Sequence, residues 1–347
     1  MKQQRSFIVF IGCLLGTLTA YAHHSYSEYD DTKTVEIEGK LVEVAWQNPH
    51  ARILVQVNGA DGAATWDIES AGLNNFRRMQ VPLEIFKVGD TVKVAGWPSK
   101  RSGVRMYGTN LLSGDGQELV MWRYSTPRWA ATAHGYGSDH SLFEPGTATK
   151  SAILFRTWAS DLDAPDANPA SLFARFDWPL TESARQAAAQ FNVVENTTTV
   201  GCTQKGMWAI MRQPFPIEFI DREDTIVLRI EEYDTVRTIH IRANVAADEQ
   251  PRTLLGYSSG RWDGNTLVVE TTRLSEPYHT NTGVPMGDSS KLVERFTPSA
   301  DGSRLDYTLS ITDPDSLTRP VEGKRSWVWR PGEQVMPFNC VEPSAAR

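Results

Sequence analysis

Short segments in which apolar and polar residues alternate dominate the second half of the chain. Successive side chains of a β-strand point to opposite faces, so this period of two predicts strands with one buried face. Turn residues such as Asp263-Gly264-Asn265 and Asp301-Gly302 separate the segments. The clearest alternating residues are Ile217 and Phe219; Ile226, Leu228 and Ile230; Ile239 and Ile241; and Leu305, Tyr307, Leu309 and Ile311. Residues 191–347 are therefore predicted to form an antiparallel lipocalin-like barrel or a sandwich.

Residues 34–122 also have the pattern of short strands separated by turns. In residues 34–46 the apolar parity changes after Gly39: Val35 and Ile37 share one face, and Val42, Val44 and Trp46 share the other. Such a change is typical of a bulge or glycine bend in a strand that curls around a small barrel. A helical connection is expected after the third strand. The pattern predicts an OB-like barrel over residues 23–122, which makes the chain mainly β.

The stretch 123–190 is rich in Pro, Ala, Ser, Asp and Gly and has weak periodicity. We interpret it as a long linker that packs on one of the domains. Thr181 is a good helix cap, so a helix is expected at about 181–191.

The N-terminus has the pattern of a secretory signal peptide. Lys2 and Arg5 precede an apolar run over residues 6–20, and Ala20-Tyr21-Ala22 places small residues where a signal peptidase reads them. Residues 1–22 are therefore expected to be removed, which gives a periplasmic or secreted chain that begins at His23. A lipoprotein cleaved at Cys13 and an uncleaved anchor are the alternatives, but the apolar run continues past Cys13.

The charge of the chain limits the kinds of partner that it is expected to bind, and its cysteines bear on a predicted disulfide. Loss of Lys2 and Arg5 changes the formal net charge from −7 to −9, and no basic stripe is visible, so nucleic acid is not an expected partner. No segment after residue 22 is long and apolar enough to span a bilayer. Only Cys202 and Cys340 remain after cleavage, and in an oxidising compartment they are predicted to form a disulfide.

Histidines near the predicted new N-terminus suggest a metal site. A chain that begins at His23 offers its amine and an imidazole as a chelating pair, and His24 or His50 would complete the site. Such nitrogen ligands suit Cu(II). The alternative is a terminus and a loop histidine without a ligand role.

Charged residues continue the apolar faces of the predicted second-domain strands. Glu232 follows the parity of Ile230, Arg237 that of Ile239, and Glu294 precedes Phe296 on the same face. If these faces point into a barrel, the charges must pair or neutralise. Glu232, Glu294 and Arg237 are thus candidates for acid–base chemistry, and Arg237 also for ligand binding. The alternative is a structural ion-pair network, or strand ends that reach solvent.

Two further patterns concern aromatic residues and a serine. Trp327 and Trp329 share one face of the last strand and are predicted to line a pocket for an apolar or aromatic ligand; the alternative is that they only fill the core.

The run from Gly256 to Gly260 matches G-x-S-x-G. A hairpin rather than a helix follows it, so the pattern does not indicate a serine hydrolase.

Several motifs resemble those of an uncharacterised family of secreted bacterial two-domain proteins. The first domain carries Ala22-His23-His24-Ser25 and Trp46-Gln47-Asn48-Pro49-His50. The β-rich second domain carries Gly260-Arg261-Trp262-Asp263-Gly264 and Trp327-Val328-Trp329-Arg330-Pro331-Gly332-Glu333. The resemblance implies export and two domains, and it implies no activity.

Three functions are consistent with these features. The first is a periplasmic, non-catalytic binding or accessory protein for a small apolar or aromatic molecule, with copper in the first domain. The second is a cofactor-independent isomerase, hydratase or lyase in the second barrel, with Glu232 or Glu294 as acid or base and Arg237 stabilising negative charge. The third is a structural protein that binds partners in the cell envelope.

Overall fold

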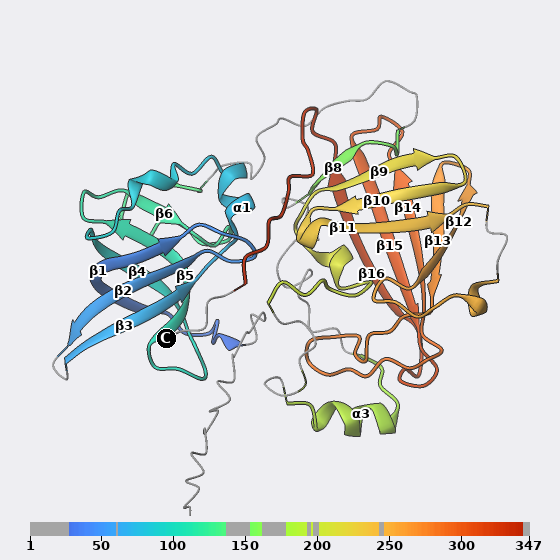
Figure 1. The fold of residues 1–347 in the computed structure, drawn as a ribbon, viewed down its shortest axis with the longest axis horizontal. Helices are drawn as coiled ribbons and strands as arrows, with labels where there is room; N and C mark the ends of the chain where they lie inside the picture. The colour runs from blue at the N-terminus through green and yellow to red at the C-terminus, as the bar shows by residue number, and fades with distance from the viewer. Residues whose placement is uncertain are drawn as a thin grey trace, which may run out of the picture.

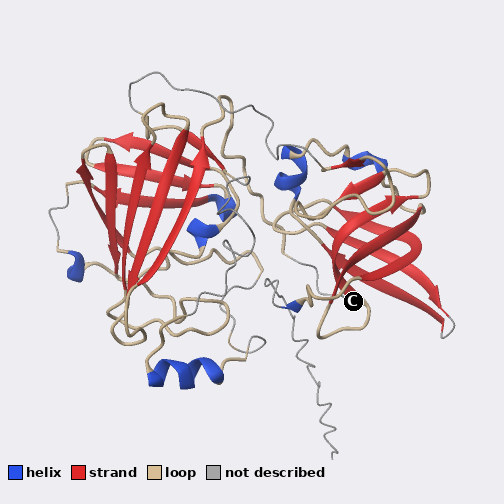
Figure 2. Ribbon diagram, turned by 180° about the vertical axis from the view of Figure 1, so that it is seen from behind, coloured by secondary structure: helices blue, strands red, loops and turns tan. Residues whose placement is uncertain are grey.

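The computed structural model describes residues 28–59, 62–136, 153–161, 178–192, 196, 201–242 and 246–342. Two β-barrels stand side by side (Figure 1). Figure 2 shows how little helix accompanies the strands. The predicted mainly β fold is confirmed. Within the described residues, no helix has the length and apolar character needed to cross a membrane.

The first barrel has five strands with OB-like connectivity. Its strands are β1 (Val35–Ala45), β2 (Arg52–Gly59), β3 (Gly62–Glu69), β4 (Thr91–Pro98) and β5 (Arg105–Ser113). β1 pairs antiparallel with β2 and with β4, and a parallel pairing of β3 with β5 closes the barrel. The connection from β3 to β4 contains α1 (Leu73–Arg78) and the 3₁₀ helix η2 (Leu83–Ile85).

Strand β1 curls around this barrel at two places. A Cβ atom on Gly39 would lie 2.2 Å from the backbone oxygen of Gln56, so only glycine fits this close approach to β2. The register of β1 against β2 shifts between Leu41 and Glu43, which is a bulge, one of the two features that the change of parity predicts. The bulge buries Leu41 and leaves Val42 39 % exposed. The prediction that Val42 shares a face with Val44 and Trp46 is therefore wrong, because those two side chains pack against the core.

The second barrel closes through nine strands in the order β10-β11-β12-β13-β14-β15-β16-β8-β9. The strands are β8 (Thr157–Ser160), β9 (Ile217–Arg222), β10 (Thr225–Ile230), β11 (Thr235–His240), β12 (Tyr257–Asp263), β13 (Thr266–Thr272), β14 (Lys291–Pro298), β15 (Arg304–Thr312) and β16 (Val321–Val328). Neighbouring strands are antiparallel, except that β11 and β12 are parallel. The structure thus decides between the two alternatives in favour of a barrel.

The range 123–190, predicted as a linker, does more than connect the barrels. β7 (Ala133–His134) pairs with β6 (Glu118–Val120) on the sheet of the first barrel. β8 lies between β16 and β9, so a strand from this range closes the second barrel. Trp158 anchors β8 in the core with a fully buried side chain. β8 is too short for alternation to indicate a strand.

Thr181 is the N-cap of α3 (Glu182–Ala189). Its hydroxyl accepts a hydrogen bond from the backbone N–H of Ala184 at 3.3 Å, as its residue type predicts.

The C-terminal segment after β16 runs between the two barrels (Figure 1). The side chain of Asn48, in the loop after β1, donates to the carbonyl of Phe338 at 2.7 Å, and the N–H of Val341 donates to the carbonyl of Asn48 at 2.8 Å. A disulfide joins Cys340 to Cys202, with the two Cα atoms 5.7 Å apart, which confirms the predicted bond.

A buried ionic network also links the barrels. Arg78, the last residue of α1, donates to the two carboxylate oxygens of Glu231 at 2.6 and 2.5 Å and to Glu333 at 3.2 Å. The amide of Asn74 donates to Glu231 at 3.0 Å. Glu231 follows β10 and Glu333 belongs to the C-terminal segment, so the network joins the first barrel to two parts of the second.

Candidate functional site

A polar cluster lies buried inside the second barrel. Arg237 on β11 donates to both oxygens of Glu294 on β14, at 3.1 and 2.5 Å. It also donates to the hydroxyls of Thr271 on β13, at 2.7 Å, and Ser258 on β12, at 3.0 Å. Tyr307 on β15 donates to Glu294 at 3.0 Å. Arg237 and Glu294 therefore form an ion pair inside the barrel. Ser258, from the G-x-S-x-G run, accepts a hydrogen bond from Arg237.

The geometry of this cluster is that of a structural network. The planar guanidinium of Arg237 meets both carboxylate oxygens of Glu294, which is a strong and specific arrangement. Burial and the neighbouring Glu294 raise the pKa of Tyr307 well above its usual value, so the phenol stays protonated at neutral pH. The ionisable groups thus satisfy one another, in line with the ion-pair alternative.

Glu232 does not belong to this cluster, so the prediction that it continues the inward face of a strand, as Arg237 and Glu294 do, is wrong. β10 ends at Ile230, and Glu232 begins the 3₁₀ helix η4 (Glu232–Asp234) outside the strand. One carboxylate oxygen accepts from Lys205 at 2.6 Å; the other is buried and has no hydrogen-bond partner in the described part of the chain. Burial raises the pKa of Glu232, opposed by Lys205 and by His50 of the first barrel. The structure thus places Glu232 within electrostatic reach of His50.

His50 follows the cis Asn48-Pro49 bond and lies two residues before β2. Its Nδ1 lies 3.0 Å from the carbonyl oxygen of Ser70, and its Nε2 lies 3.6 Å from a carboxylate oxygen of Glu69. His23 and His24, the other predicted copper ligands, lie outside the described residues. Among the described ones, no three His, Cys, Asp or Glu side chains are grouped to hold a metal ion.

The two candidate tryptophans have different surroundings in the structure. Trp327 is fully buried and packs edge-on against Tyr307, with ring centroids 5.5 Å apart. β16 ends at Val328, and beyond it Trp329 meets the guanidinium of Arg156 at 4.5 Å from the ring centroid. Trp327 fills the core, as the alternative stated.

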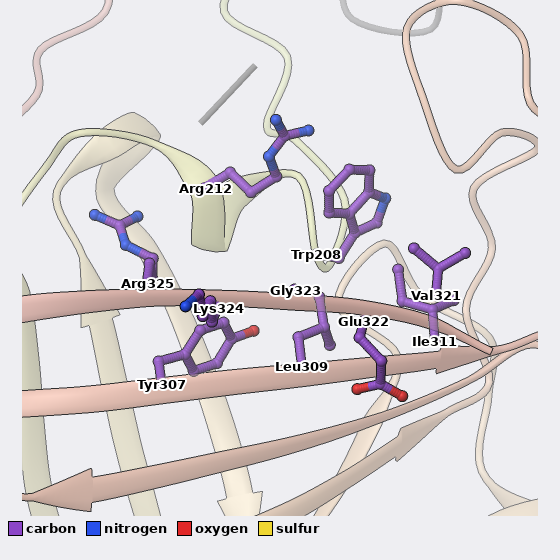
Figure 3. A pocket seen from close by; sticks show the side chains of 10 residues that line it. All are labelled: Trp208, Arg212, Tyr307, Leu309, Ile311, Val321, Glu322, Gly323, Lys324 and Arg325. Atoms are coloured by element: carbon purple, nitrogen blue, oxygen red, sulfur yellow. The ribbon is translucent and has the colours of Figure 1, made fainter. Parts of the chain in front are cut away.

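A partly open hollow of about 40 Å³ lies between β15, β16 and the segment that carries Trp208 and Arg212 (Figure 3). That volume is enough for several water molecules. Inward-facing apolar residues of the two strands form its floor. The hollow is lined by Trp208, Arg212, Tyr307, Leu309, Ile311, Val321, Glu322, Gly323, Lys324 and Arg325.

Sequence reasoning missed most of this lining. Trp208 and Arg212 come from the stretch between Cys202 and β9, which has no strand periodicity and contains only the 3₁₀ helix η3 (Ile210–Arg212). One signal was available: Gly323 interrupts a strand pattern, and such a glycine often marks the close approach of a ligand.

Comparison with known proteins gives a family match for the region of the first barrel. Residues 13–108 match a family of unknown function (DUF6152). The matched range includes Asn48-Pro49-His50 and extends from before β1 into β5. No curated protein matches the chain. The comparisons therefore attach an uncharacterised family to the N-terminal part and assign no activity.

Proposed function

We propose that this chain is a periplasmic, non-catalytic binding protein that holds a small apolar or aromatic molecule in the hollow of the second barrel. Export is part of the proposal and is supported by the signal pattern of residues 1–22. The ligand would lie between the indole of Trp208 and the apolar floor formed by Leu309, Ile311 and Val321 (Figure 3).

The observation that carries this proposal is the glycine in the middle of β16. Gly323 pairs with Leu309 of β15, and a Cβ atom placed on it would meet only the Cβ of Leu309, at 4.0 Å. The backbone does not require glycine, because Gly323 is not among the residues with positive φ. Glycine in a strand costs roughly 0.5 to 1 kcal/mol relative to alanine. A costly glycine that leaves open space on an inward face supports a ligand site.

The ionisable groups beside the hollow favour binding over catalysis. A general acid or base needs a pKa near the working pH and a proton within reach of the ligand. Tyr307 is held in its protonated form, and the oxygens of Glu294 accept hydrogen bonds from Arg237 and Tyr307. The cofactor-independent enzyme is therefore the weaker proposal.

Gly323→Leu is expected to fill the hollow and to weaken the binding of benzamide, a neutral aromatic probe, by about tenfold or more. The reason is that the new side chain and the probe would occupy the same space. Ligand-observed NMR or calorimetry measures the affinity. Thr308→Leu, on the exposed face of β15, adds a comparable apolar group outside the hollow and should leave the affinity unchanged. A folded Gly323→Leu variant that binds benzamide like the wild type would show that the ligand sits elsewhere.

A second candidate function is copper binding by the first barrel, and the orientation of His50 favours it. The contact of Nδ1 with the carbonyl of Ser70, at 3.0 Å, is the kind of bond that fixes the ring of a metal-ligating histidine. The other ring nitrogen, Nε2, then faces the carboxylate of Glu69. The remaining ligands would be the amine and imidazole of a chain cleaved before His23.

Protein processed to begin at His23 is expected to bind one Cu(II) ion per chain in a calorimetric titration. A His23→Ala, His50→Ala double variant should lose this binding, and His240→Ala in the second barrel should retain it. Unchanged copper affinity in the double variant would remove the proposal.

A further inference from the structure

We infer that the second barrel has an anion site outside the hollow, where Arg156 and Trp329 bind a small aromatic carboxylate. This site is independent of the proposed function, because neither residue lines the hollow. The arguments are the position of the two residues at one edge of the barrel, the indole rings that hold the guanidinium, and the lack of a counter-charge beside it.

Arg156 and Trp329 come together because two strands of the barrel meet at one edge. Arg156 directly precedes β8, and Trp329 directly follows β16. These strands are antiparallel neighbours, with Val328 opposite Ala159, so the start of β8 lies beside the end of β16. The closure of the barrel therefore makes this pair of residues.

The guanidinium of Arg156 lies against two indole rings. Its central carbon is 4.5 Å from the ring centroid of Trp329 and 5.3 Å from that of Trp158. Trp158 is fully buried and forms a fixed base for this contact, whereas Trp329 is only partly buried. An indole ring attracts a cation but has no net charge of its own, so these contacts orient the guanidinium without neutralising it.

No carboxylate pairs with Arg156 in the part of the chain that the structure describes. Within those residues the guanidinium donates no hydrogen bond, and its Nη1 is buried without a partner. Burial lowers the pKa of Arg156, and no charged neighbour among the same residues opposes this effect. Arginine stays charged at neutral pH, so Arg156 is a cation that has lost part of its water shell without gaining an anion.

Two other buried arginines have what Arg156 lacks. Arg78 pairs with Glu231 and Glu333, and Arg237 pairs with Glu294. An unpaired, partly buried cation lowers the stability of the fold, and such a cost is often found where a residue serves binding. A bound carboxylate would supply the missing charge through charge-assisted hydrogen bonds.

The two residues favour an aromatic carboxylate over a phosphate. A single guanidinium matches the charge and the planar shape of one carboxylate, whereas a phosphate carries more charge and is commonly bound by several arginines. The partly buried indole of Trp329 offers ring surface beside the guanidinium. A small molecule with one ring and one acid group would contact both residues.

Benzoate and benzamide test this inference, since they have nearly the same shape and differ in charge. Calorimetry on the full chain at neutral pH and low salt is expected to show benzoate binding about tenfold more tightly than benzamide. Arg156→Gln should remove this preference, and Arg156→Lys should retain part of it. Arg319→Gln is the matched control, because Arg319 is exposed and lies between β15 and β16, away from Trp329; it should change neither affinity.

Thermal unfolding distinguishes binding from a structural role. Arg156→Gln removes a cation that has no counter-charge in the described residues, so the midpoint of the ligand-free chain should change by no more than about 2 °C. Saturating benzoate should raise the midpoint of the wild type more than that of the variant. A marked fall in the ligand-free midpoint of Arg156→Gln, with benzoate affinity unchanged, would show that Arg156 only supports the fold and would overturn the inference.

Gly323→Leu separates this site from the hollow. The preference for benzoate should persist in this variant, even where benzamide binding is weakened as the proposed function requires. A preference that disappears in Gly323→Leu would place the carboxylate in the hollow and overturn this inference alone. Equal affinities for the two probes in the wild type, or a preference that persists in folded Arg156→Gln, would also overturn it and leave the proposed function standing.

Discussion

Arg78→Met is expected to lower the free energy of unfolding by about 3 to 5 kcal/mol, because it removes one partner of a buried ion pair. Glu231 and Glu333, which Arg78 contacts at 2.5 and 3.2 Å, are both buried and would lose this cation. The thermal midpoint should fall by roughly 10 °C. Scanning calorimetry measures the effect, and limited proteolysis reports whether the C-terminal segment loosens.

Arg77→Met is the matched control, since Arg77 precedes Arg78 in the same helix and is exposed. It should change stability by less than about 0.5 kcal/mol. Adding Glu231→Gln to Arg78→Met should recover part of the loss, because it removes an uncompensated buried charge. If Arg78→Met is no less stable than Arg77→Met, the network contributes nothing to holding the barrels together.

Replacing both Cys202 and Cys340 with serine is expected to destabilise the folded chain by about 2 to 5 kcal/mol. The bond spans 138 residues. On the chain-entropy model, closing a loop of this length lowers the entropy of the unfolded chain and so stabilises the folded state by about 5 kcal/mol. Part of the C-terminal segment should remain in place, because Phe338 packs against Phe215 and Tyr233 with ring centroids 5.5 and 5.1 Å away.

The measurement is the thermal midpoint with and without reductant. Reductant should lower the midpoint of the wild type to that of the double serine variant and leave the variant itself unaffected. A wild-type midpoint that is the same in oxidised and reduced protein would contradict the prediction.

Much of the fold follows from local pattern. The alternation over Leu305, Tyr307, Leu309 and Ile311 places all four side chains on the buried face of β15. This works because the direction of a side chain in a strand depends only on its parity along the chain. The disulfide was predictable by counting, since two cysteines follow the signal pattern.

Glu232 shows where the pattern stops being informative. Its parity continues that of Ile230, but the chain leaves the strand in between, and Tyr233 and Asp234 then adopt positive φ angles of 56° and 50°. Non-glycine residues rarely adopt this conformation, so the residue types at these positions do not predict a turn. Trp208 and Arg212 were missed for a related reason, because their segment lacks any regular period.

The sequence by itself determined the buried face of strands such as β15, the presence of a bulge or glycine bend in β1, and which two cysteines form a bond. Only the tertiary structure decided which charges meet. Arg237 and Glu294 are 57 residues apart in the chain, and Arg78 and Glu231 are 153 apart. Side-chain alternation is a property of neighbouring residues, whereas these ion pairs depend on how each barrel closes and how the two barrels pack together.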